Sequence, residues 1–154
     1  MYVRNILAIA ALLAARKVTA SCLHGTSLLP RQVDEEGRVE VSNFGYTGEL
    51  GPTNWAAIDP ANIACATSSV QSPINIDQSI ALAAEPPTIR FQNVREAEFE
   101  NLGSTVEVVV NGTTIIGGKE FTLQQFHFHT PSEHRIGEEY FPAEMHMVHE
   151  AAGA

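Results

Sequence analysis

Three histidines and a glutamate occur within nine residues, in the segment FHFHTPSEH at 126–134, of a chain that contains six histidines. Imidazole nitrogen is the commonest side-chain ligand for metals in proteins. On a β-strand successive side chains point to opposite faces, so His127 and His129 share one face with Gln125. The spacing therefore predicts a pair of imidazoles placed side by side, which can hold a metal ion.

A second strand, expected at 143–149, offers two more histidines. Alternation places His146 and His149 on opposite faces, so they are not expected to serve the same metal. Glu144 shares the face of His146, and carboxylates beside ligating histidines commonly orient the ring. A hydrogen-bonded structural role is the alternative for every histidine here, and it is preferred for His134 and His149. The predicted ligands are His127, His129 and His146, which would leave a tetrahedral zinc ion one position open to water.

A different metal site fits some of the same residues. The spacing of His127, His129 and Glu133 resembles the first metal motif of cupins, in which two histidines and a glutamate join a later histidine on a small β-barrel. The cupin motif also has flanking glycines, where this chain has Phe121 and Tyr140. This departure weighs against the cupin interpretation, and the two are distinguished by whether Glu133 contacts the metal.

The part of the chain after residue 87 has the pattern of an antiparallel sheet. Runs rich in β-branched and aromatic residues follow one another, separated by Gly, Asn or Pro. Asn111-Gly112 lies between two of these runs and is a strong hairpin-turn signal. No comparably long stretch after residue 20 has helical periodicity, so the fold is predicted to be mainly β. The predicted strands are 88–94, 105–110, 113–116, 121–129 and 143–149.

The beginning of the chain is predicted to be a signal peptide, residues 1–20. It has a positively charged start, an apolar run at 6–15 that is too short to span a bilayer, and small residues before Ser21. Cleavage there would give a secreted protein with no stable membrane anchor. The alternative is a short uncleaved anchor, because Arg16 and Lys17 lie between the apolar run and the cleavage site. Residues 21–43 are polar and acidic, and we interpret them as a lead-in to the domain that is not part of its core.

The charge of the chain limits its partners. Three of its nine Lys and Arg residues lie in the predicted signal peptide, which has no acidic residue. The remainder therefore has six cationic residues against 18 acidic ones, a formal net charge of −12. Nucleic acids and anionic membranes are not expected to bind such a surface.

Two further features bear on secretion. Asn111-Gly112-Thr113 is a sequon for N-glycosylation, which competes with the hairpin-turn interpretation of the same residues. Cys22 and Cys65 could form a disulfide in an oxidising compartment. Cys22 would lie at the extreme N-terminus of the mature chain, so Cys65 could instead have another partner.

Taken together, these motifs resemble those of the α-class carbonic anhydrases. QFHFHTPSEH (125–134) followed by AEMHMVHE (143–150) resembles the zinc-binding segments of that family. Three other motifs occur in the order found in the family, over roughly residues 44–150: FGYTGELGPTNW (44–55), QSPINI (71–76) and NLGSTVEV (101–108). The resemblance implies a mainly β fold with a central, twisted antiparallel sheet, and a zinc-dependent enzyme that reversibly hydrates carbon dioxide to bicarbonate and a proton.

The resemblance also implies roles for individual residues. His127, His129 and His146 match the zinc ligands, while Gln125 and Glu144 match residues that hydrogen-bond the first and third ligand. Glu133 matches a buried glutamate that, in the family, accepts a proton from a threonine hydroxyl beside the reacting oxygen. The remaining matches are Val148 in the wall of the carbon dioxide pocket, and Tyr46 and Asn101 in the solvent network above the metal.

Two departures from the family pattern change what is expected. Ser104 occupies the position where fast family members have a proton-shuttling histidine, so proton transfer to buffer is predicted to limit turnover. The family domain continues well beyond the position of His149 through several more strands. These strands contain the threonine that faces the buried glutamate, and the usual disulfide partner of the family's cysteine near position 65. We therefore expect 44–154 to be the N-terminal portion of a domain with an incomplete sheet, and Cys65 to pair outside this chain.

Three functions follow from these observations. The first is a secreted zinc enzyme acting on carbon dioxide and bicarbonate, with catalysis assigned to the full-length form. The second is a non-catalytic, carbonic-anhydrase-like extracellular binding module, and the third is a cupin-like metalloprotein. The intact set of three histidines favours the enzyme.

Overall fold

The computed structural model describes residues 25–27, 30–39, 41 and 43–151. The predicted signal peptide and Cys22 lie outside the described residues. No helix in the described ranges is both long enough and apolar enough to cross a membrane.

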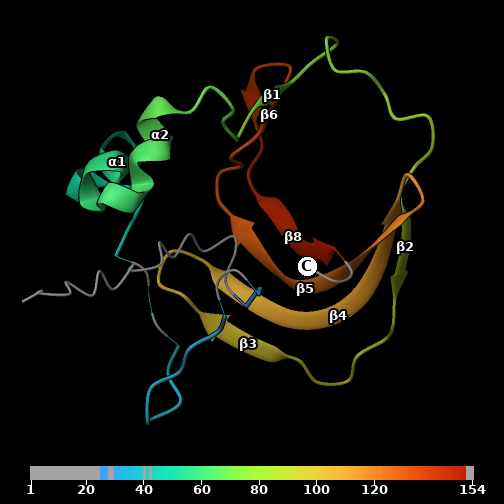
Figure 1. Cartoon of the computed structure of the whole chain (residues 1–154), viewed down its shortest axis with the longest axis horizontal. Coiled ribbons are helices and arrows are strands. Elements are labelled where there is room, and N and C mark those ends of the chain that lie inside the picture. Colours follow the sequence, from blue (N-terminus) through green and yellow to red (C-terminus); the bar gives the residue numbers. More distant parts are fainter. Residues whose placement is uncertain (1–24, 28–29, 40, 42, 152–154) are drawn as a thin grey trace, which may run out of the picture.

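A curved, antiparallel sheet forms the centre of the structure (Figure 1). Its long strands are rich in β-branched and aromatic residues, whose side chains fit a pleated, half-buried surface. The order is β2-β4-β5-β8, and β3 also pairs with β4. The prediction of a mainly β fold with a twisted antiparallel sheet is confirmed. The strands are β2 (Thr88–Phe91), β3 (Glu98–Asn101), β4 (Val106–Ile116), β5 (Lys119–His129) and β8 (Glu144–Ala151).

The predicted hairpin turn at Asn111-Gly112 is wrong. β4 runs through these two residues with a β-bulge between Val109 and Gly112, and the hairpin to β5 turns instead at Gly117-Gly118. Both of these glycines have positive φ, 56° and 76°, which suits a tight two-residue turn. Gly112 is needed for a different reason, since a Cβ there would lie 2.3 Å from Cδ1 of Phe91 on β2.

Short elements complete the described structure. A small sheet contains β1 (Asn75–Ile76), β6 (Arg135–Ile136) and β7 (Glu139–Tyr140), with β1 parallel to β6. The helical turns lie to one side of the main sheet (Figure 1). They are η2 (Gly48–Leu50), η3 (Pro52–Asn54), α1 (Trp55–Ile58), η4 (Pro60–Ile63) and α2 (Ala64–Thr67).

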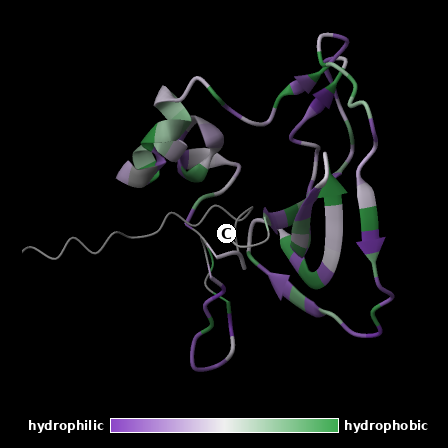
Figure 2. Ribbon diagram, turned by 45° about the vertical axis from the view of Figure 1, so that its right-hand side comes forward, coloured by the Kyte–Doolittle hydropathy of each residue, from purple (hydrophilic) through white to green (hydrophobic). Residues whose placement is uncertain are grey.

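The two faces of the main sheet differ in chemistry, and the strands are accordingly banded in Figure 2. Paired residues Glu100, Glu107, His127 and His146 form one row across β3, β4, β5 and β8. We call the side of this row the histidine face. The neighbouring positions form an apolar row on the opposite face: Phe99, Val108, Phe126 and Met147.

The segment predicted to be a lead-in contacts the main sheet. The guanidinium of Arg31 contacts carboxylate oxygens of Glu100 and Glu107, both at 2.8 Å. The side chains of these glutamates are 4% and 0% exposed. Ser27 N–H also donates to the Glu150 carboxylate on β8. A buried carboxylate is unstable without a partner, so this segment belongs to the folded domain more closely than its polar sequence indicated.

Candidate metal centre

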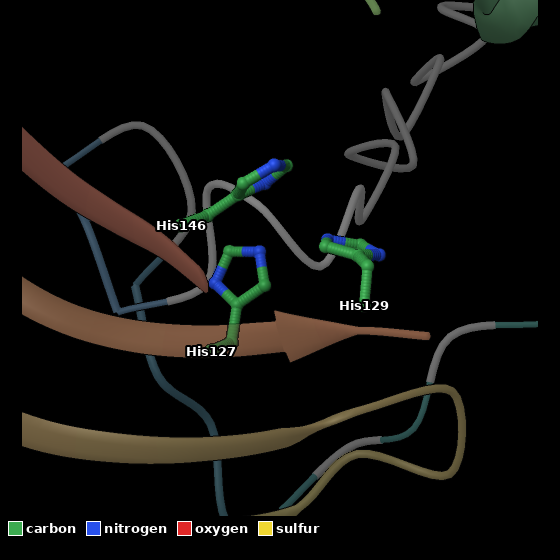
Figure 3. Close-up of side chains that lie close together, drawn as sticks. All are labelled: His127, His129 and His146. Atoms are coloured by element: carbon green, nitrogen blue, oxygen red, sulfur yellow. The ribbon is translucent and has the colours of Figure 1, made fainter. Parts of the chain in front are cut away.

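Three histidines converge on the histidine face. His127 on β5 pairs directly with His146 on β8, and His129 lies two residues further along β5. Their ring centroids are separated by 5.1 Å (His127–His129), 5.2 Å (His127–His146) and 4.5 Å (His129–His146). One nitrogen of each ring lies within 4.8 Å of the other two (Figure 3). The structure thus brings together the three predicted ligands from two adjacent strands.

Two of the rings are oriented by side chains from their own strands. Nδ1 of His127 lies 2.9 Å from Oε1 of Gln125, and Nε2 of His146 lies 2.8 Å from Oε1 of Glu144. Because an oxygen acceptor holds the proton of the neutral ring at that nitrogen, the other nitrogen keeps its lone pair. His127 therefore offers Nε2, and His146 offers Nδ1.

The third ring, that of His129, is approached from outside the sheet. Its Nδ1 lies 3.2 Å from the hydroxyl of Tyr46 and 3.3 Å from Oε1 of Glu133. This leaves Nε2 to face the other two histidines. Nε2 of His127 and Nε2 of His129 are both buried with no hydrogen-bond partner among the described residues. Two buried, unpartnered nitrogens beside a third imidazole fit a metal ion, which would bind their lone pairs.

The electrostatics keep the rings of His127 and His129 neutral. Burial, together with repulsion from His129 and His146, lowers the pKa of His127 to about 4. Burial also lowers the pKa of His129, against the opposing attraction of Glu133. Neutral imidazole is the form that binds metals, so these two ligands are ready to bind at neutral pH.

Glu144 links the triad to the loop that precedes β6. Its Oε2 accepts hydrogen bonds from the backbone amides of Glu133 and His134, each at 2.8 Å. Its Oε1 lies 2.6 Å from Nδ1 of His134 as well as close to His146. Burial alone would raise the pKa of Glu144, but these hydrogen bonds outweigh it and lower the pKa to about 2. Glu144 is therefore an anion throughout the neutral range.

His134, expected to have a structural role, is the other partner of Glu144. Its Nε2 lies 3.3 Å from the hydroxyl of Ser72, in the loop before β1. His134, Glu144 and His146 are close enough to form a second potential metal group, but the contacts of Glu144 with both rings account for their proximity. Ser72 was missed as a neighbour of the site, and its place in the QSPINI motif was the available signal.

The remaining histidine of β8 and three other predicted site residues form no hydrogen bond with the rings of the triad among the described residues. Val148 pairs with Gln125 across the sheet and is half-buried. The Oγ of Ser104 is buried without a hydrogen-bond partner in the described part of the chain. The side chain of Asn101 accepts a hydrogen bond from Gly103 N–H and so stabilises its own turn. His149 lies beside Thr114, 2.8 Å from its Oγ1, and is not one of the triad.

The residues predicted to be modified are both accessible. Asn111 is exposed within β4, and Cys65 is exposed on α2 with a free thiol.

A curved antiparallel sheet with three convergent histidines on one face, two of them buried, defines a β protein with a candidate metal centre. The model of the eukaryotic-type carbonic anhydrase family matches residues 50–153. The chain therefore belongs to the eukaryotic-type, or α-class, carbonic anhydrase family. This membership removes the cupin alternative, in agreement with the position of Glu133, which faces the Nδ1 side of His129 and not its free Nε2.

Known relatives share both sequence and fold with the chain. A carbonic anhydrase from Pectobacterium carotovorum is 38% identical over 112 residues, which are 71% of this chain and 46% of that protein. The α-carbonic anhydrase of Aspergillus oryzae is 43% identical with a TM-score of 0.65, over 71% of this chain and 48% of the fungal chain. The enzyme of Thermovibrio ammonificans, solved with the inhibitor sulfanilamide, is 35% identical with a TM-score of 0.63, over 71% and 50%. The chain spans about half the length of the relatives that it matches.

Proposed function

We propose that this chain contains the zinc centre of a carbonic anhydrase, which reversibly hydrates carbon dioxide to bicarbonate and a proton. The observation that supports this most directly is the convergence of three imidazole nitrogens, two of them buried and without a hydrogen-bond partner in the described structure. The ligands would be Nε2 of His127, Nε2 of His129 and Nδ1 of His146. Zinc, when bound, lowers the pKa of a coordinated water to about 7, a shift for which carbonic anhydrase is itself the reference case, and so supplies a nucleophile at neutral pH.

The residues of the chain prepare this site in two ways. Gln125 and Glu144 fix the tautomers and orientations of His127 and His146, so that their free nitrogens point to one place. Burial lowers the pKa of His127 and keeps protons from competing with the metal. Val148, two residues after His146 on β8, supplies apolar surface beside the triad for an uncharged substrate such as carbon dioxide.

Ser104 has a consequence for the proton that the reaction releases. A serine hydroxyl does not titrate near neutral pH, so it cannot accept and pass on this proton as an imidazole does. We propose that buffer molecules carry the proton away and limit the turnover.

The proposal is tested by measuring carbon dioxide hydration by the full chain in stopped flow, with zinc added. His146→Ala should abolish both zinc binding and hydration, because it removes a ligand. His149→Ala is the matched control, since it removes a histidine of the same strand that contacts Thr114 instead, and it should retain both. Zinc binding with no hydration would support either the non-catalytic binding module or catalysis that needs the further strands of the family domain, and no zinc binding would refute the metal centre.

We also propose that the chain is secreted, on the evidence of the signal-like segment at 1–20. N-terminal sequencing of the protein from the medium of expressing cells should begin near Ser21. If the protein instead stayed in the cells with residues 1–20 still attached, secretion would be contradicted.

A further inference from the structure

His129 is held differently from the other two histidines of the triad. Gln125 and Glu144 each lie two residues before the ring that they contact, on the same strand. The partners of His129 come from elsewhere: Tyr46 precedes it by 83 residues, and Glu133 follows in the loop after β5.

The three groups form a closed set of contacts. The hydroxyl of Tyr46 donates to Oε1 of Glu133 at 2.9 Å, which uses its only proton. Nδ1 of His129 lies 3.2 Å from that hydroxyl oxygen and 3.3 Å from the same carboxylate oxygen. With the proton of Tyr46 directed at Glu133, both oxygens can only accept from the ring. His129 must therefore have its proton on Nδ1, and its lone pair on Nε2.

Both partners are themselves fixed in place. The ring of Tyr46 packs edge-on against Phe44 and Trp55, with centroids 6.2 and 5.7 Å away. The indole Nε1–H of Trp55 is shared between the carbonyls of Gly45 and Leu50, which anchors this aromatic cluster to its own loop. The residues that flank Tyr46 are thus held before any ligand is present.

Glu133 is fixed through its backbone. Its amide donates to Oε2 of Glu144, the same carboxylate whose Oε1 contacts His146. The support of His129 is thereby connected to the support of His146. A change in the position of the 130–134 loop would move the partners of two ligands together.

We propose that Tyr46 and Glu133 act as a positioning pair for His129, holding its Nδ1–H tautomer and directing Nε2 at the metal. This inference depends on the metal centre proposed above. It differs from the roles that the family resemblance implies, in which Glu133 faces a threonine hydroxyl and Tyr46 belongs to the solvent network. Here the two residues act on the ligand itself.

Metal affinity is the first test, measured on the full chain with Zn²⁺ alone in competition with a chelator. Glu133→Leu removes the acceptor and should weaken zinc binding by roughly 10–100-fold, the usual effect of losing such a partner. Glu133→Gln should recover part of this loss, since its amide oxygen can still accept from Nδ1–H. Tyr46→Phe should also weaken binding. Glu139→Leu and Tyr140→Phe, on exposed strand β7, are the matched controls and should bind zinc as tightly as the unaltered chain.

The tautomer of His129 is the second test, read by ¹⁵N NMR of the imidazoles in the metal-free protein. The unaltered chain should show Nδ1–H at His129, and Glu133→Leu should give a mixture of tautomers, with His127 unchanged as an internal standard. Circular dichroism establishes that each variant is folded, and Glu133→Gln and Tyr46→Phe provide milder changes if the leucine variant does not fold.

The outcomes separate this inference from the proposed function. If the unaltered chain binds zinc through His146, but Glu133→Leu and Tyr46→Phe bind it equally tightly and retain the Nδ1–H tautomer, the positioning pair is refuted and the metal centre stands. If the chain binds no zinc, the proposed function fails. In that case a tautomer that still depends on Glu133 would support the positioning of the ring, and one that does not would refute it.

Discussion

Replacing Arg31 with methionine should destabilise the domain by about 3 kcal/mol at neutral pH. The guanidinium lies 2.8 Å from both Glu100 and Glu107, which are paired residues on β3 and β4. Its removal leaves two adjacent carboxylates that are almost completely buried. Removing one partner of a buried ion pair costs about 3–5 kcal/mol. We expect the lower end of this range because the side chain of Arg31 is itself 23% exposed.

Urea denaturation of the full chain measures this loss. With a slope of about 2 kcal/mol/M, the midpoint should fall by about 1.5 M. The triple variant Arg31→Met/Glu100→Gln/Glu107→Gln should recover most of the stability, because it leaves no unpaired buried charge.

Arg38→Met is the matched control for Arg31→Met. Arg38 contacts Asp34 and Glu36 at similar distances, but its side chain is 74% exposed. Exposed pairs contribute only about 0–1 kcal/mol. If Arg31→Met were no more destabilising than Arg38→Met, the attachment of the N-terminal segment to the sheet would be disproved.

Three further predictions concern the proton, pH and packing. Ser104→His should raise turnover at low buffer concentration, and imidazole buffer should accelerate the unaltered chain; no response to either would mean that proton transfer is not limiting. In the folded, metal-free chain the lowered pKa of His127 keeps its ring neutral between about pH 6.5 and pH 4, whereas the ring is protonated over this range in the unfolded chain. The free energy of unfolding should therefore decrease as the pH falls through this window, by up to roughly 3 kcal/mol. His127→Gln should flatten this part of the stability profile, and an unchanged slope would assign it to other groups. Gly112→Ala should lower the free energy of unfolding by about 1–3 kcal/mol, because the added methyl group would clash with the ring of Phe91. In a Phe91→Ala background the same substitution should be much less destabilising if that contact is the cause.

The sequence predicted the strands of the main sheet well, with two errors that have physical causes. Asn111-Gly112 has the composition of a turn, but the chain turns at Gly117-Gly118 and accommodates Asn111 in a bulge. β3 was missed because its residues, Glu98–Asn101, are mostly polar. Its buried residue, Glu100, is paired with Arg31, which is distant in sequence. Both errors arise where a partner distant in sequence overrides local preference.

The sequence by itself determined which histidines can act together. The two-residue period of a strand places His127 and His129 on one face. Glu144 shares its face with His146 and not with His149, which distinguishes the two. Glu144 could be assigned as a support for the same reason, because residues two apart on a strand lie side by side on one face, whereas the role of Gln125 was implied by the family resemblance.

Only the tertiary structure decided what surrounds these rings. Tyr46 reaches His129 across 83 residues, and Arg31 reaches Glu107 across 76. No periodicity connects such distant residues, because their proximity depends on how loops and strands pack after each has formed. The orientation of His129 and the neutralisation of the buried glutamates are therefore properties of the assembled fold, whereas the pairing of the ligands is already present in the alternation of the strand.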